Sequence, residues 1–314
     1  MCCPVAEFRI ASHEYPVAVF VNPRAGGGRA RKCLPAIKRI LAERSFPADF
    51  ILTESAEALE SHARSAIQAG RRVLFAMGGD GTLQALVNAA HGRDVVLGIL
   101  PTGGGNDFAA ALLLPKNPIA AAAAILSAKP RWVDVLCART ADGNRRLYVG
   151  GGGVGLDADA ANYSGAYAQL PGRVRYIAAA LRALREFKPL RVRAEFDGSE
   201  LPPIEAPALL AGVLNTPSYG AGLRLAPGGR IDDGLLTTLL VRNLSATQVL
   251  AVVPRLLAHG DLPESYVTRV SATRVRLTTD RECLFHGDGE ILGPAPVEIE
   301  VLHKAVRVLA PAVT

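Results

Sequence analysis

The order of strand-like and helix-like segments predicts two domains of different class, an α/β domain followed by a mainly β domain. From Pro16 to about Lys129, apolar strand segments alternate with stretches of helical periodicity. This pattern is typical of parallel strands with helices on both faces of the sheet. From Arg131 onward, short strand segments follow one another with two helical interruptions, which indicates a mainly β domain. We therefore place the boundary near residue 130, with domains at 1–130 and 131–302.

Each element is expected where an apolar run or a helical period is bounded by turn residues. A length of 314 residues, 49% of them apolar, is enough for two cores. In the first domain we expect strands at 17–21, 48–53, 72–77 and 95–100, and helices at 30–44, 55–69, 81–91 and 106–127. In the second we expect helices at 174–187 and 246–257, and strands at 131–138, 146–150, 190–197, 208–215, 235–241, 265–270, 273–279, 282–286 and 297–301.

The composition favours a cytoplasmic protein without a membrane span. No segment reaches the roughly 18 uninterrupted apolar residues of a transmembrane helix, and the N-terminus lacks the pattern of a signal peptide. The five cysteines are odd in number and lack Cys-x-x-Cys spacing, so we expect reduced thiols. Acylation of Cys2 and Cys3 is an alternative to an ordinary disordered terminus.

The basic charge favours a partner with a negatively charged surface. The formal net charge is +6, and the arginines are dispersed, without the interleaved aromatic residues that stack on bases. We therefore expect peripheral contact with anionic phospholipid at the inner face of the membrane, and no nucleic acid.

A glycine-rich turn at residues 78–82 is the most informative local feature. It reads Gly-Gly-Asp-Gly-Thr and lies between an apolar strand and a helical stretch. Glycines let backbone N–H groups approach an anion, and the following helix directs its positive dipole to the same place. Asp80 and Thr82 add a carboxylate and a hydroxyl, as a site for a Mg²⁺-nucleotide requires. The alternative is a tight structural connection.

Two further loops have the same strand–turn–helix context. One is Pro-Thr-Gly-Gly-Gly-Asn-Asp-Phe at residues 101–108, and the other is Asn-Pro-Arg-Ala-Gly-Gly-Gly-Arg at residues 22–29. Ligands of open α/β sheets bind outside the carboxyl ends of the strands, where neighbouring loops meet. Three such loops together predict a polyphosphate site.

These motifs, in this order, resemble those of the diacylglycerol kinase catalytic domain family, which includes bacterial lipid kinases and sphingosine kinases. Two C-terminal motifs extend the resemblance over nearly the whole chain: residues 230–235 resemble the family's structural metal loop, and residues 287–290 its Asp-Gly-Glu motif. P-loop and protein-kinase motifs are absent. The resemblance implies a Rossmann-like, NAD kinase-like first domain, a β-sandwich second domain and a return of residues 303–314 to the first.

The resemblance also assigns roles to residues of the first domain. Asp80 is expected to bind Mg²⁺ or the acceptor hydroxyl, although a carboxylate at a helix N-terminus can serve only the helix dipole. Thr53 and the pair Asn106 and Asp107 have helix capping as their alternative role. The nucleotide-binding residues expected are Asn22, Pro23, Arg24, Ala25, Gly26, Thr53, Gly78, Gly79, Asp80, Gly81, Thr82, Leu83, Gln84, Gly104, Asn106 and Asp107.

The second domain is expected to supply a general base and a metal site. Glu290 is the candidate base, because phosphoryl transfer to an alcohol needs a carboxylate to accept the hydroxyl proton. Its alternative is an exposed glutamate beside a type I′ hairpin turn. Asp233, with the carbonyls of Arg230 and Leu235, suits Mg²⁺, and the alternative is a simple hairpin. No catalytic role is assigned to His286 or to the glycine-dense segment 150–157. The glycines of this segment allow close approach of the backbone either to a ligand or to a partner strand.

Three positions depart from the family pattern. Gln84 and Ala85 replace the usual Asn-Glu, and Gly104 replaces a threonine. Backbone N–H groups and the Gln84 amide remain available for hydrogen bonds, so we expect phosphate binding to persist with an altered nucleotide affinity or preference.

The function expected is an ATP- and Mg²⁺-dependent lipid kinase acting on diacylglycerol, a phosphatidylglycerol-like lipid or a sphingoid base. The alternatives are an NAD kinase-like enzyme, which the motif at 101–108 disfavours, and a nucleotide-binding regulator with little catalysis. The identity of the lipid and the oligomeric state are left open by the sequence.

Overall fold

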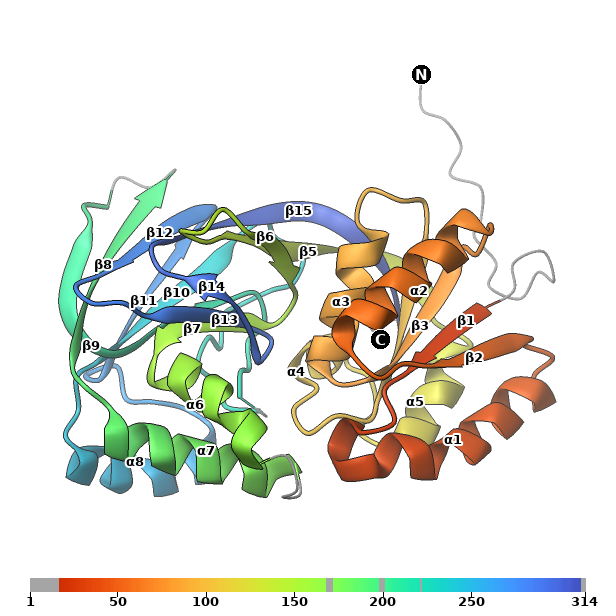
Figure 1. Ribbon diagram of the computed structural model, residues 1–314, viewed down its shortest axis with the longest axis horizontal. Helices are drawn as coiled ribbons and strands as arrows, with labels where there is room; N and C mark the ends of the chain where they lie inside the picture. Colours follow the sequence, from red (N-terminus) through yellow and green to blue (C-terminus); the bar gives the residue numbers. More distant parts are fainter. Residues whose placement is uncertain (1–16, 168–171, 198–200, 221, 312–314) are drawn as a thin grey trace. The chain divides into compact units, whose positions relative to one another are not determined.

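The computed structural model describes residues 17–167, 172–197, 201–220 and 222–311 (Figure 1). The chain forms two compact units: one contains the residues up to Val133 and those from Ala305, and the other runs from Asp134 to Lys304. The expected boundaries were residues 130 and 302. Cys2 and Cys3 lie outside the described residues.

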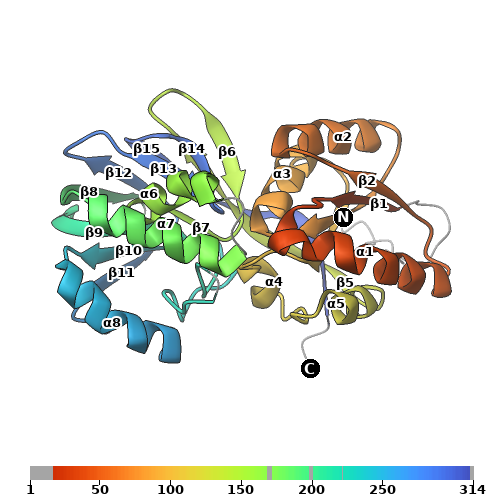
Figure 2. The ribbon, with the colours of Figure 1, turned by 60° about the horizontal axis from the view of Figure 1, so that its bottom comes forward.

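The first unit is an α/β domain with a parallel sheet, as predicted. Its strands lie in the order β4-β3-β1-β2, and all three pairings are parallel. β1, β3 and β4 are buried along their whole length, because helices cover both faces of the sheet (Figures 1 and 2). Helices α1 and α5 pack on one face, and α2 and α3 on the other. The bounds are β1 Val17–Val21, α1 Ala25–Glu43, β2 Ala48–Leu52, α2 Ala56–Gln68, β3 Val73–Gly78, α3 Asp80–Ala90, β4 Val96–Pro101, α4 Asp107–Ala111 and α5 Pro118–Ile125.

The prediction of one helix over 106–127 was wrong. α4 ends at Ala111, and α5 begins only at Pro118. Leu113 has a φ of 61°, which a continuing helix does not allow, and Asn117 caps the new helix by accepting hydrogen bonds from the backbone N–H groups of Ile119 and Ala120. The two prolines between the segments therefore mark a true interruption.

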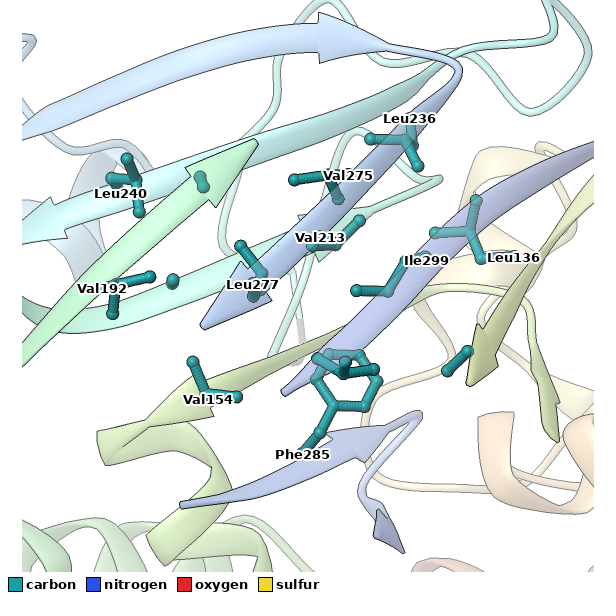
Figure 3. Packing of buried hydrophobic residues seen from close by; sticks show 14 of the residues in the cluster. Leu136, Val154, Val192, Val213, Leu236, Leu240, Val275, Leu277, Phe285 and Ile299 are labelled. Carbon is teal, nitrogen blue, oxygen red and sulfur yellow. The ribbon is translucent and has the colours of Figure 1, made fainter. Parts of the chain in front are cut away.

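The second unit is mainly β and sandwich-like, also as predicted. β9 is its central strand: one edge pairs with β7 and β8, and the other pairs with β10. The core between the layers is apolar, and Phe285 lies within it (Figure 3). Phe285 and Tyr148 are its largest fully buried side chains. The bounds are β5 Lys129–Arg139, β6 Arg145–Tyr148, β7 Gly151–Gly155, α6 Leu156–Ser164, a 3₁₀ turn Gly165–Tyr167, α7 Gly172–Glu186, β8 Leu190–Asp197, β9 Ile204–Leu214, β10 Leu236–Arg242, α8 Ala246–His259, β11 Val267–Ala272, β12 Arg274–Thr279, β13 Leu284–Gly287, β14 Glu290–Pro294 and β15 Val297–Ala310.

β15 extends well beyond the expected strand at 297–301. Residues Val297 to Glu300 pair with β12 in the second unit, and Arg307 and Val308 pair in parallel with β4 in the first. The C-terminal part of this strand thus belongs to the sheet of the first unit. None of the described helices is long and apolar enough to span a membrane.

Candidate functional site

The turn between β3 and α3 packs directly against the turn after β4. The carbonyl of Gly78 accepts hydrogen bonds from the backbone N–H groups of Thr102 and Gly103, at 2.8 and 3.0 Å. A Cβ on Gly103 would lie 2.4 Å from Cα of Gly79, and a Cβ on Gly78 would lie 2.0 Å from Oγ1 of Thr82. A side chain on Gly103 would therefore separate the two turns, and one on Gly78 would displace Thr82.

Asn106 closes the turn after β4 with its own side chain. Its Oδ1 accepts a hydrogen bond from the Gly103 N–H at 3.0 Å, and its Nδ2 donates to the Gly103 carbonyl at 2.9 Å. Asn106 is the N-cap of α4 in the left-handed conformation, yet its side chain caps no helical N–H. The capping alternative therefore does not account for the Asn106 side chain.

The loop at 22–29 joins the same group of turns. Asn22 donates from its backbone to the Met77 carbonyl at 3.0 Å, and its Nδ2 lies 3.5 Å from Oγ1 of Thr82. Gly26, Gly27 and Gly28 have φ values of 60°, 66° and 86°, a run of left-handed residues that glycine adopts readily. A Cβ on Gly26 would lie 2.1 Å from the Thr102 carbonyl oxygen.

The Arg29 side chain links the loop at residues 22–29 (the first loop) to the turn after β4 (the third loop). Its Nη2 donates to the carbonyls of Gly103 at 2.8 Å and Pro101 at 3.4 Å, and its Nε donates to the carbonyl of Thr102 at 3.3 Å. One guanidinium thus bonds three successive carbonyls of one turn. The structure therefore brings together the three loops that the sequence singled out.

Asp80 and Asp107 form a pair of carboxylates at the centre of these loops. Asp80 Oδ2 accepts from the backbone N–H of Asp107 at 3.2 Å, and Oδ1 accepts from that of Phe108 at 3.3 Å. Burial, followed by the charge of Asp107, raises the pKa of Asp80 to about 6 despite these hydrogen bonds. Two neighbouring carboxylates of this kind fit a hard divalent cation, which offsets their repulsion.

The other expected nucleotide residues of this unit differ in exposure. Thr53 is buried, and its hydroxyl donates to the Val21 carbonyl at 3.2 Å. The helix that follows is capped by Ser55, so Thr53 is not its N-cap. Leu83, Gln84 and Ala85 are buried in α3. A Cβ on Gly104 would meet open space, so the absence of the family threonine is not imposed by crowding. Pro23, Ala25, Gly79, Gly81 and Gly104 are half-buried, and Arg24 is exposed.

The expected metal loop lies in the second unit and is held by the fully buried Asp134. Asp134 Oδ2 accepts from the Gly234 N–H at 2.7 Å, and Oδ1 accepts from the Lys304 N–H at 2.7 Å. Asp233 is exposed, and its Oδ1 accepts from the Leu235 N–H at 3.0 Å.

Such a loop fits a hydrated cation rather than a cage of side chains. No group of three or more His, Cys, Asp or Glu within the described ranges is arranged to hold a metal ion. An exposed carboxylate together with main-chain carbonyls remains a donor set that Mg²⁺ accepts, with water completing the shell. Metal binding by Arg230, Asp233 and Leu235 stays a prediction.

Glu290 is exposed and follows a tight turn at the start of β14. It pairs with Gly287 of β13, and the two residues between them, Asp288 and Gly289, have φ values of 53° and 86°. Positive φ at both central residues is the requirement of a type I′ hairpin turn. The structure therefore contains the type I′ turn with an exposed glutamate that was the alternative for this motif. The role of Glu290 as a base stays a prediction.

Three side chains form a polar cluster on the α6 side of this hairpin. The Tyr219 hydroxyl donates to Asp157 Oδ2 at 3.1 Å and lies 2.6 Å from His286 Nε2, which is itself 3.3 Å from Asp157 Oδ2. Burial, followed by the Asp157 carboxylate, raises the pKa of Tyr219 well above its usual value, so Tyr219 remains a proton donor. The cluster therefore connects β13 both to α6 and to the loop that follows β9.

The glycine-dense segment 150–157 makes room for this cluster and for partner strands. A Cβ on Gly151 would lie 2.8 Å from the Tyr219 ring, and one on Gly153 would lie 2.4 Å from Asp157 Oδ2. On the opposite face, a Cβ on Gly152 would lie 2.1 Å from the His286 carbonyl oxygen of β13. Of the two alternatives for these glycines, close approach to a partner strand is the one that the structure shows.

Sequence reasoning missed several residues that organise these sites. Arg29 was quoted as part of a motif without a role, and Asp134, Asp157, Tyr219 and Asp288 were not assigned any. A polar residue inside an apolar strand, as Asp134 is in β5, was a signal of a buried partner. The other partners lie far apart along the chain, and a single sequence does not reveal them.

Comparisons with known proteins agree with this architecture. The model of the diacylglycerol kinase catalytic domain matches residues 16–138, and that of the YegS C-terminal NAD kinase beta sandwich-like domain matches residues 152–310. A diacylglycerol kinase of Mycobacterium tuberculosis is 31% identical over 301 residues, which cover 94% of this chain and 95% of the relative. A probable YegS-like lipid kinase of Stenotrophomonas maltophilia is 29% identical and covers 81% of this chain and 83% of its own.

Solved structures show the same fold. The crystal structure of a putative diacylglycerol kinase from Bacillus anthracis superposes with a TM-score of 0.75 at 24% identity, covering 99% of this chain and 98% of that one. Fold and sequence together place the chain in a family of two-domain proteins whose named members are lipid kinases. The chain belongs to the diacylglycerol kinase family, with its catalytic domain followed by the YegS-type sandwich domain.

Proposed function

We propose that this chain transfers the γ-phosphate of ATP to the hydroxyl of a lipid such as diacylglycerol, at the surface of a membrane and with Mg²⁺. The observation that carries the proposal is the contact of three strand-end loops around Asp80 and Asp107 in the first unit. Near-complete coverage of relatives named diacylglycerol kinase supports the choice of acceptor.

The residues of the first unit suit the binding of a triphosphate. The left-handed run at Gly26–Gly28 and the glycines at 79, 81, 104 and 105 place no side chains between the backbone and an incoming anion, which suits the binding of phosphate oxygens by N–H groups. Asp80 and Asp107 are the residues that would hold Mg²⁺. When bound, this ion neutralises charge on the phosphates during transfer. Arg29 keeps the first and third loops in register, so the binding surface is formed before the nucleotide arrives.

The second unit supplies the candidate base. Glu290 is exposed at the start of β14, where its carboxylate can accept the proton of an acceptor hydroxyl. The hydroxyl oxygen then bonds the γ-phosphorus as the bond from that phosphorus to the β,γ-bridging oxygen breaks and ADP leaves. The expectation that Glu290 faces the glycine turns of residues 78–81 stays a prediction. The net charge of +6 supports work at an anionic lipid surface, which would place the enzyme peripherally on the cytoplasmic face of the membrane.

A transfer assay tests the proposal against both alternatives. The purified chain is incubated with γ-labelled ATP, Mg²⁺ and mixed micelles containing diacylglycerol, phosphatidylglycerol or sphingosine, and separately with NAD. We expect label in a lipid product, lost on chelation and in Asp80→Ala, and kept in Asp94→Ala, whose side chain is 83% exposed. Label in NAD alone would identify an NAD kinase-like enzyme. Nucleotide binding with no transfer to any acceptor would identify a regulator.

A further inference from the structure

Asp288 occupies an unfavourable backbone conformation immediately before Glu290. Its φ of 53° is left-handed, which is unfavourable for a residue with a Cβ, although aspartate tolerates it better than most. Gly289, the next residue, has a φ of 86° and carries no such cost. A left-handed aspartate persists where its surroundings determine it, so its contacts explain the turn.

The Asp288 carboxylate is bonded to three successive backbone N–H groups at the start of the glycine-dense segment. Oδ2 accepts from Val149 at 2.8 Å, and Oδ1 accepts from Gly150 at 2.8 Å and from Gly151 at 3.3 Å. The Asp288 N–H in turn donates to the Gly151 carbonyl at 2.8 Å. Hydrogen bonds to an ionised acceptor are about twice as strong as neutral ones, so this tether is strong enough to offset the left-handed backbone.

The chemistry of the tether requires a carboxylate. Three N–H donors converge on two oxygens, and an ionised aspartate has only acceptors. An asparagine of the same shape would retain one oxygen and turn an NH₂ group toward a backbone N–H, leaving one donor without an acceptor. A Cβ on Gly150 would lie 3.0 Å from Asp288 Oδ1, so a side chain there would press on the carboxylate.

We propose that Asp288 is a positioning residue that sets the place of the Glu290 carboxylate by tying the β13–β14 turn to the backbone at 149–151. This inference rests on the proposed function, in which Glu290 is the base. Glu290 is two residues beyond Asp288 and is the first residue of β14, so a turn released from the tether moves the start of the strand and its side chain. Asp288 itself touches no reacting atom.

A double-mutant cycle on transfer kinetics distinguishes positioning from a general structural role. Asp288→Asn should lower kcat by about 10- to 100-fold, the cost of misplacing a catalytic group by about 1 Å, with the KM for ATP within about twofold. In a Glu290→Gln background the same change should cost less than about threefold, because the group that it positions is gone. An equal loss in both backgrounds would overturn the proposal.

Asp142→Asn is the matched control. Asp142 lies in the β5–β6 turn of the same unit, where its carboxylate likewise accepts from local donors, including Oγ1 of Thr140 and the N–H of Asn144. We expect kcat to stay within about twofold of the wild-type value. If Asp288→Asn does not fold, Asp288→Glu replaces it. This variant keeps the acceptors but shifts them by one methylene, and the same loss of kcat is expected.

Amide hydrogen exchange gives a readout that does not depend on the reaction. In Asp288→Asn the amides of Val149, Gly150 and Gly151 should exchange at least about tenfold faster than in wild type, while in Asp142→Asn they should not. Unchanged exchange rates at these amides would contradict the proposal that Asp288 holds the backbone at residues 149–151. A fully active Glu290→Gln with faster exchange in Asp288→Asn would instead show that the tether exists and that the assignment of the base is wrong.

Discussion

The carboxylate of Asp80 accepts a hydrogen bond from the backbone N–H of Asp107, the residue whose charge most raises its pKa after burial. The same two residues thus attract each other through the backbone and repel each other through their side chains. The repulsion is the property that a divalent cation relieves, and it makes the apo protein sensitive to pH.

Asp80→Asn should change the pH dependence of stability in the absence of metal and nucleotide. The pKa of Asp80 is about 6 in the folded chain and 3.8 in the reference state, so its contribution to stability is complete below pH 4 and lost as the pH rises through 6. The variant has no such loss. Urea unfolding in the presence of chelator measures the free energy of unfolding of both proteins. Between pH 4 and pH 8, this free energy should rise in the variant relative to wild type by on the order of 1–3 kcal/mol, with the lower value if water reaches the carboxylate. A difference independent of pH would contradict the raised pKa.

Arg29→Lys should weaken ATP binding without unfolding the domain. A lysine cannot bond the carbonyls of Pro101, Thr102 and Gly103 together, so the third loop loses its fixed position relative to the first. Calorimetric titration should give a Kd for Mg²⁺-ATP raised by about 3- to 30-fold, equivalent to about 0.7–2 kcal/mol. Arg31→Lys, at an exposed position on the same helix, is the control and should leave Kd unchanged. Equal affinities for all three proteins would contradict the role of Arg29 in fixing the third loop.

Asp233→Ala should remove a divalent ion from the second unit. Loss of the carboxylate leaves only main-chain carbonyls and water, which bind Mg²⁺ poorly. We expect elemental analysis of dialysed protein to show a lower metal content than in wild type, with a lower Tm in Mg²⁺ and little change in ATP affinity. Asp261→Ala, which removes a surface carboxylate paired with Arg255, should keep the wild-type metal content. Equal metal in all three proteins would show that this loop is a simple hairpin.

Tyr219→Phe should destabilise the second unit. The half-buried Asp157 and the buried His286 would lose the hydroxyl that bonds both of them, at a cost of about 1–3 kcal/mol in the free energy of unfolding. Urea denaturation measures this directly. Tyr266→Phe, at a half-buried position for comparison, should change stability by less than about 0.5 kcal/mol. A stable Tyr219→Phe would mean that the cluster contributes little.

The regular elements were predictable because buried positions recur at a regular spacing and are occupied by apolar residues. β1, β3 and β4 are apolar throughout and flanked by glycine or proline, and their bounds differ from expectation by at most about one residue. β7 was not predicted, because Gly151 to Gly155 have low intrinsic preference for a strand. It is a strand only because β9 and β13 approach it on either side.

The candidate site was predictable to the extent that motifs carry it. The loops with Asn22, Asp80 and Asn106 were found because glycine turns after strands have a recognisable chemistry. The tethers between distant segments were not found, since Asp288 meets Val149 and Asp134 meets Gly234 only after the strands have paired. Such contacts depend on tertiary structure and leave no local pattern.

Glu290→Gln is the measurement that tests the central claim most directly, because it keeps the shape of the side chain and removes the proton acceptor. With diacylglycerol micelles and saturating Mg²⁺-ATP, kcat should fall by about 10²- to 10⁴-fold while ATP affinity stays nearly unchanged. Glu282→Gln, an exposed glutamate just before the same hairpin, should retain full activity. A loss of less than about threefold in Glu290→Gln would contradict the assignment and pass the role of base to Asp80.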